Sequence, residues 1–112
     1  MIRIAFHREG GALAGFEARG HAGHSAKGTD VVCAAVSAIL LTALAGLKDV
    51  VGANPRALRR DSSGYLRVAI PSSVNGAARR DADLALRVAR SGLEAIARDY
   101  PESIEVYDKF GG

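Results

Sequence analysis

The chain has 112 residues, of which 48% are hydrophobic and 24% are charged, and it contains a single cysteine. This length and composition predict one folded domain spanning residues 1–112 and exclude a disordered chain, while one cysteine excludes an internal disulfide. The net charge of +3 is modest, and the opening MIRIAFHREGG is too short and too charged for a signal peptide, so we expect a cytoplasmic protein.

A strand hairpin is predicted at the start of the chain. Apolar residues alternate with polar ones from Ile2 to His7 and again from Ala14 to Arg19, which is the period of a half-buried strand. The turn residues Glu9-Gly10-Gly11 separate the two runs. After a small, polar loop over Ala22–Gly28, the composition predicts a helix from about Asp30 to about Val51, with Gly52 as its stop signal.

This helix invites a membrane interpretation, because Val31–Leu47 carries no charged residue. A membrane span needs about 20 strongly apolar residues. The run is shorter, is rich in alanine and contains Ser37 and Thr42. We therefore expect no membrane contact and a helix buried on most sides within the domain, with the remaining apolar surface covered at a subunit interface.

The second half of the chain repeats the same pattern of elements. A weak strand over Ala57–Arg60 and a clear strand over Tyr65–Ile70 flank the turn Asp61–Gly64. An amphipathic helix then runs from about Ala77 to Tyr100, ahead of Pro101, and Ile104–Tyr107 forms a last strand. The order β-β-α-β-β-α-β predicts an α+β fold: a mainly antiparallel sheet with two helices packed on one face.

Cys33 is the residue that most clearly indicates a chemical reaction. Thr29 and Asp30 are residue types that cap helices, which would place Cys33 at about the third or fourth position of the first turn. A helix N-terminus favours negative charge and hence the reactive thiolate, and a nearby histidine can exchange the proton. The alternative is a small buried hydrophobe, the usual role of a free cysteine.

A zinc site built from His21, His24 and Cys33 is a weaker hypothesis. The two histidines lie on a loop, a fourth ligand is not evident, and the C-x-x-C spacing of structural zinc sites is absent. We therefore expect no metal.

The segment GHAGHSAKGTDVVCAAVSA, from Gly20 to Ala38, resembles the signature of the ribosomal-processing cysteine protease family, Prp. The resemblance implies a catalytic histidine at His21 and a nucleophile at Cys33, with Gly20, Asp30 and Ser37 binding substrate or orienting the site. It further implies a cofactor-independent homodimer that removes the N-terminal extension of large-subunit ribosomal protein L-twenty-seven. Many members carry an aromatic residue in the loop where this chain has Ala26-Lys27.

Other interpretations of the same residues stay open. Asp30 is a helix cap by default and can also orient His21 or bind the substrate backbone. Ser37, one turn after Cys33, either bonds to its own helix or lines the substrate cleft. For the whole chain, the alternatives are a redox-sensing thiol protein and a non-catalytic ribosome-assembly module that binds RNA or protein. RNA contact is compatible with the arginines but is not required, and we favour a solvated basic surface.

Overall fold

The structure is a computed structural model that describes residues 1–20, 29–60 and 64–109, without the side chains of Thr29 and Asp30. Its elements follow the predicted order. They are β1 (Ile2–Glu9), β2 (Ala12–Arg19), α1 (Thr29–Gly46), the π-helical turn η1 (Leu47–Val51), β3 (Arg56–Arg60), β4 (Tyr65–Ala69), α2 (Gly76–Asp99) and β5 (Ile104–Asp108).

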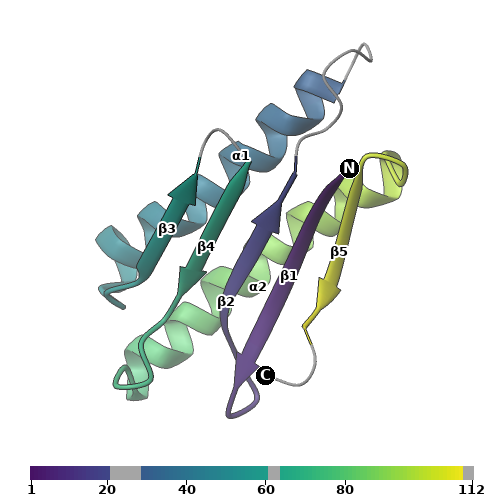
Figure 1. Cartoon of the computed structure of the whole chain (residues 1–112). Helices are drawn as coiled ribbons and strands as arrows, with labels where there is room; N and C mark the ends of the chain where they lie inside the picture. The colour runs from purple at the N-terminus through teal and green to yellow at the C-terminus, as the bar shows by residue number, and fades with distance from the viewer. Residues whose placement is uncertain (21–28, 61–63, 110–112) are drawn as a thin grey trace.

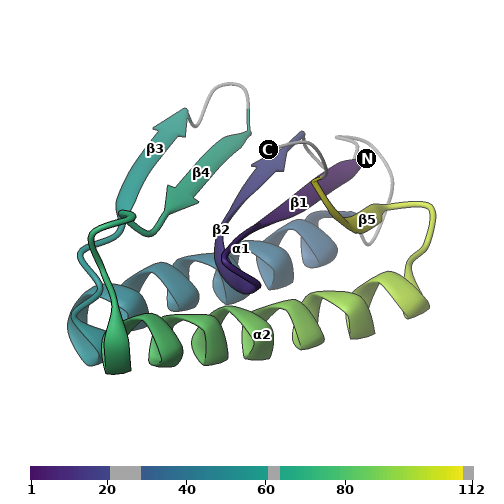
Figure 2. The same ribbon diagram turned by 90° about the horizontal axis from the view of Figure 1, so that it is seen from below.

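The five strands form one sheet in the order β3-β4-β2-β1-β5, and both helices cover the same face of it (Figures 1 and 2). Three neighbouring pairs are antiparallel, whereas β1 and β5 are parallel, with Ile2 opposite Ile104. The α+β prediction of a mainly antiparallel sheet is therefore confirmed. The parallel pair arises because α2 carries the chain back along the covered face before β5 begins, as a parallel connection requires.

The β1–β2 hairpin is shaped by its glycines. Gly10 and Gly11 have φ values of 59° and 84°, the left-handed conformation that a tight two-residue hairpin turn needs at both central positions. The register shifts after His7, which pairs with Gly15 while Arg8 pairs with Leu13, so β2 carries a bulge. A side chain at Gly15 would collide with the His7 ring, and glycine is needed there because of that close approach.

Helix α1 packs into the core through one stripe, formed by Val32, Val36, Leu40 and Ala43, and Leu47 of η1 continues that stripe. Its prediction as a helix buried on most sides was wrong. The segment Val31–Val51 is long and apolar enough to cross a membrane by length and composition, yet only 28% of its most apolar window is buried. One stripe suffices because a sheet face covers only one side of a helix, so much apolar surface of α1 remains uncovered.

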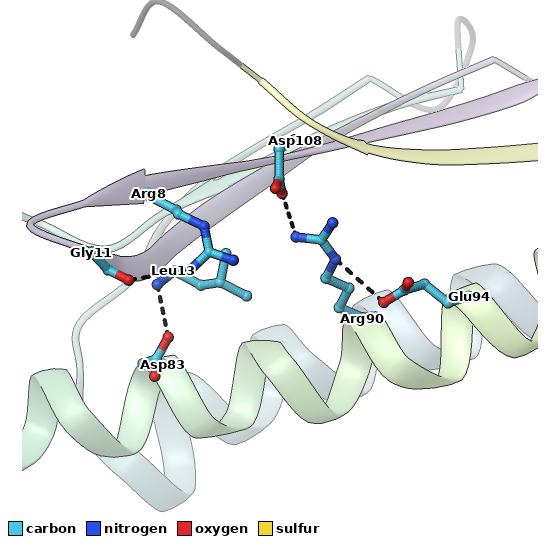
Figure 3. Close-up of polar contacts among 7 residues, drawn as sticks. All are labelled: Arg8, Gly11, Leu13, Asp83, Arg90, Glu94 and Asp108. Atoms are coloured by element: carbon cyan, nitrogen blue, oxygen red, sulfur yellow. Dashed lines mark hydrogen bonds and ion pairs between the residues drawn. The ribbon is translucent and has the colours of Figure 1, made fainter.

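Helix α2 is anchored to the sheet by packing and by two polar contacts (Figure 3). The backbone N–H of the buried Leu13 donates a 2.8 Å hydrogen bond to Oδ1 of Asp83. Arg90 pairs with Asp108 of β5 and, at 3.4 Å, with Glu94, while its guanidinium lies 5.4 Å from the centre of the Phe6 ring. These contacts fix α2 along the sheet, so the core closes between the two layers.

Candidate active site

A pocket of about 170 Å³ lies at the end of the sheet where β2 ends and α1 begins. In Figure 1, β2 ends and α1 begins at the upper end of the view. The pocket is lined by residues of α1, the sheet and the β3–β4 connection: Ile2, Ala18, Gly20, Cys33, Val36, Ser37, Leu40, Leu41, Arg59, Arg60, Gly64, Tyr65 and Leu66. It is smaller than typical small-molecule sites of 300–1,000 Å³, and its size suits one or two side chains of an extended peptide.

Cys33 and Ser37 both line this pocket from α1. Cys33 is half-buried and not disulfide-bonded, and Ser37 is exposed. They are four residues apart, so the helix brings them to the same face. The thiol therefore borders a hollow that solvent and a ligand can enter, which the interpretation of Cys33 as a core residue would not require.

The helix start differs slightly from the sequence prediction. Thr29 is the first helical residue, so Cys33 is the fifth residue of α1 and not the third or fourth. The unbonded N–H groups of a helix belong to its first four residues. Cys33 thus follows those groups by one position. It still lies near the partial positive charge of the helix N-terminus.

Gly20 occupies a position that only glycine fits. Its φ of 92° is left-handed, and a Cβ atom there would collide with the backbone carbonyl of Met1. Its N–H donates a 3.0 Å hydrogen bond to the carbonyl of Gly64 beside the β3–β4 connection. Gly20 therefore fixes the direction in which the chain leaves β2, and the next residue in the sequence is His21.

A polar cluster of Glu17, Arg19 and Tyr65 lies beside the pocket. The Tyr65 hydroxyl donates a 2.6 Å hydrogen bond to Glu17, and Arg19 Nε donates a second, at 3.2 Å. The bond from Tyr65 holds the pKa of Glu17 below its ordinary value of 4.5, and the same bond raises the pKa of Tyr65 above 10.0. Accordingly the phenol keeps its proton and its place in the pocket wall.

The sequence prediction assigned none of the basic and aromatic wall residues to the site. Arg59, Arg60 and Tyr65 come from β3 and β4, far from the signature in sequence. The alternation of apolar and polar residues predicted that they lie on strands. No motif or residue spacing in the sequence indicated that those strands lie near Cys33. Their part in the pocket follows from the sheet order, which sets β4 next to β2.

Several predicted site features lie outside the described residues. These are His21, His24, the side chain of Asp30 and the Ala26-Lys27 departure. Within the described part of the chain, no group of three or more His, Cys, Asp or Glu side chains is arranged to hold a metal ion. Of the predicted site, the structure thus brings together Gly20, Cys33 and Ser37.

Comparison with known proteins agrees with this geometry. The family model described as cysteine protease Prp matches residues 1–105. The chain belongs to the cysteine protease Prp family. Its members are thiol-dependent peptide-bond hydrolases, so the prediction that this chain is a cysteine protease is confirmed.

A relative from Bacillus subtilis (strain 168), named ribosomal processing cysteine protease Prp, is 33% identical over 91 residues, which cover 81% of each chain. The Prp protease of Staphylococcus aureus, solved in complex with a substrate peptide, superposes with a TM-score of 0.85 at 24% identity. That match covers 97% of this chain and all of the other. The same enzyme with a covalently linked product peptide gives a TM-score of 0.81 at 24% identity over the same shares. The fold is therefore that of the Prp proteases.

Proposed function

We propose that this chain removes the N-terminal extension of large-subunit ribosomal protein L-twenty-seven during ribosome assembly in the cytoplasm, with Cys33 as nucleophile and His21 as general base. The observation that carries the proposal is the pocket beside the half-buried, unpaired Cys33, which Gly20 and Ser37 also line. The Bacillus subtilis relative is named for ribosomal processing, which supports the choice of substrate.

The proposed reaction uses four proton transfers, two to form the acyl-enzyme and two to hydrolyse it. His21 takes the proton of the Cys33 thiol, and the thiolate attacks the scissile carbonyl to form a tetrahedral intermediate. Collapse breaks the C–N bond, the imidazolium gives its proton to the leaving amine, and a thioester acyl-enzyme remains. His21 then takes a proton from water, whose oxygen attacks the thioester, and the cleaved segment leaves as a carboxylic acid while the thiol is restored.

The pocket offers support to the other parts of this reaction. Backbone N–H groups in the first turn of α1 lack intrahelical partners and would stabilise the negative charge that develops on the carbonyl oxygen. The apolar wall formed by Val36, Leu40 and Leu66 accepts an apolar side chain of the substrate near the cleaved bond. Ser37 offers a hydroxyl to the peptide backbone or to the thiolate.

The test is cleavage of a peptide that spans the extension junction, followed by mass spectrometry of both products. Wild-type protein should release two fragments whose summed mass exceeds that of the peptide by one water. Cys33→Ala should keep the fold, because alanine is a good helix former, and should abolish cleavage. A Cys33→Ala variant with full activity would contradict the nucleophile.

The alternatives give different outcomes in the same assay. A redox-sensing thiol protein would oxidise at Cys33 with peroxide and leave the peptide intact, and a binding-only module would retain the uncut peptide. Ser91→Ala, an exposed change on α2 away from the pocket, is the matched control and should keep full turnover.

We also propose that the enzyme is a homodimer that buries the outer face of its two helices. A groove of about 710 Å³ runs between α1, η1 and α2, and it is lined largely by apolar side chains. Val50, Leu84 and Val88 are 85%, 55% and 65% exposed at or beside it. A patch of this kind on a monomer indicates an interaction site, and the uncovered surface of α1 adjoins it.

Sedimentation velocity tests the dimer. Wild-type protein should sediment as a dimer at micromolar concentration, and Leu84→Glu with Val88→Glu should shift it to a monomer because two carboxylates would be desolvated. The charge-matched control Ala57→Glu with Leu58→Glu, on the far edge of the sheet, should stay dimeric. A wild-type monomer under these conditions would refute the proposal.

A further inference from the structure

Within the part of the chain that the structure describes, no helix covers the second face of the sheet, since α1 and α2 both lie on the other side (Figure 2). The strand register arranges its side chains in rows that cross the sheet from β5 to β3. One row is Glu105, Arg3, Arg19, Tyr65 and Arg60, and the next is Tyr107, Ala5, Glu17, Arg67 and Leu58. A third is His7, Gly15, Ala69 and Arg56. We refer to these three rows as the open face.

Positive charge dominates the open face. Its only two carboxylates among the described residues are already engaged, since Glu105 lies 3.5 Å from Arg3 and Glu17 accepts bonds from Arg19 and Tyr65. The face carries further cations on β3 and β4, at Arg56, Arg60 and Arg67, all of which are exposed. Such an excess of one sign over a flat surface attracts a polyanion.

His7 adds no charge to this surface near neutral pH. Its burial, together with the nearby cations Arg67 and Lys109, keeps the pKa of His7 below its ordinary value of 6.5. The influence of Lys109 and Glu9 on His7 indicates one further cation and one further carboxylate near the open face, and these two charges offset each other. The positive field therefore comes from permanent cations, and we expect it to persist across the physiological pH range.

A shallow hollow of about 230 Å³ interrupts the open face between β3 and β4. Arg56 and Arg67 line it, together with the apolar side chains of Leu58 and Ala69 and the neighbouring Ala57. An apolar floor with guanidinium groups at the rim suits a planar ring that carries a phosphate, such as a nucleotide. A carboxylate-rich peptide would have no ring to place on that floor.

Aromatic rings and guanidinium planes alternate across the same surface. Arg19 and Arg60 lie 5.0 Å and 6.0 Å from the centre of the Tyr65 ring, and Tyr107 is 40% exposed on the opposite edge. Unstacked bases bind by stacking on such rings and on arginine planes, and a flat sheet face is a common platform for them. Charge, hollow and rings thus lie on one surface.

We propose that the open face binds single-stranded RNA, with Arg56 and Arg67 contacting phosphates and Tyr107 stacking on a base. This activity is distinct from the proposed proteolysis: Arg60 and Tyr65 of the open face also line the pocket of Cys33, but Arg56, Arg67 and Tyr107 do not. The helix face proposed for the dimer lies on the other side of the sheet, so the open face stays accessible in a dimer.

The test is fluorescence anisotropy with a fluorescein-labelled single-stranded RNA of 15 nucleotides and mixed sequence. The affinity should fall about twentyfold between 50 and 200 mM salt if about three phosphates are neutralised. Arg56→Glu with Arg67→Glu should weaken binding by tenfold or more, and the milder Arg56→Gln with Arg67→Gln serves if the glutamates unfold the protein. Tyr107→Ala should weaken binding about fivefold, the loss of one stacked base.

The matched control is Arg80→Glu with Arg98→Glu on the exposed side of α2, which changes the net charge equally and should leave RNA binding within twofold of wild type. Both double variants should still cleave the junction peptide. Absence of RNA binding, or equal losses in the two glutamate variants, would overturn the proposal. Competition by poly-glutamate as effective as that by unlabelled RNA would also overturn it, since an acidic protein segment would then be the better occupant.

Discussion

Replacing Gly20 with alanine should destabilise the protein by about 2 kcal/mol, and this number follows from the geometry at the end of β2. A non-glycine residue in the left-handed conformation costs about 1–2 kcal/mol. The new Cβ would also displace the carbonyl of Met1, a move that we place at about 1 kcal/mol, the low end for overpacking, because Met1 is 47% exposed. Alanine restricts the unfolded chain, which offsets roughly 0.5–1 kcal/mol.

The measurement is equilibrium urea unfolding followed by circular dichroism, with thermal unfolding beside it. In a domain of this size, about 2 kcal/mol corresponds to a melting temperature lowered by roughly 8 °C. At 25 °C the variant should remain mostly folded, and its kcat/KM for the junction peptide should fall by tenfold or more, because Gly20 directs the chain into His21.

Gly46→Ala is a control of opposite sign. Gly46 has an ordinary helical φ of −64°, and nothing lies within 4 Å of the position its Cβ would take. Alanine should stabilise α1 there by about 0.5–1 kcal/mol. All variants are compared at one protein concentration, because association changes apparent stability. A Gly20→Ala protein as stable as wild type would refute the argument from conformation and close approach.

Three further predictions rest on single contacts. Asp83→Ala should lower the unfolding free energy by about 1.5–3 kcal/mol in urea titrations, because the N–H of buried Leu13 loses its charged acceptor, whereas Asp83→Asn should recover part of that loss. The stabilisation from the Tyr65–Glu17 bond should be constant between about pH 5.5 and 9. It should disappear as the pH falls through the lowered pKa of Glu17 or rises through the raised pKa of Tyr65. A Tyr65→Phe variant measured across pH should lack the alkaline loss and show a smaller acid loss, because Arg19 still bonds Glu17. Ser37→Ala should lower kcat/KM about tenfold if its hydroxyl bonds the substrate, a loss of about 1.4 kcal/mol, and unchanged kinetics would make Ser37 a structural residue.

Much of the fold was predictable because apolar and polar residues alternate along its strands and because residues that start or stop a helix flank its helices. Ile2, Ile4 and Phe6 alternate in sequence and are buried in the structure, and the second helix ends at Asp99, one residue before the expected Tyr100. Such patterns are local, so a short window of sequence contains them.

What the sequence did not predict depends on residues distant along the chain. The β1–β5 pairing, the hydrogen bond from Leu13 to Asp83 and the place of Tyr65 beside Cys33 each join segments separated by tens of residues. The first helical segment ends at Val51 before Gly52, as predicted, but its last turn, from Leu47 to Val51, is π-helical, and Gly52 closes it with φ of 71°. Hydrophobic periodicity does not distinguish that turn from an α-helical one.

Because β1 pairs in parallel with β5, the first strand of the sheet cannot complete its pairing before the last strand has been made. Ile2, which forms part of the pocket wall, is held opposite Ile104. Until residues 104–108 have been synthesised, one edge of β1 has no partner, and pairing across such a separation is a slow, non-local step. The pocket wall at Ile2 is therefore fixed only after residues 104–108 have been synthesised, later than the rest of the pocket lining, which ends at Leu66.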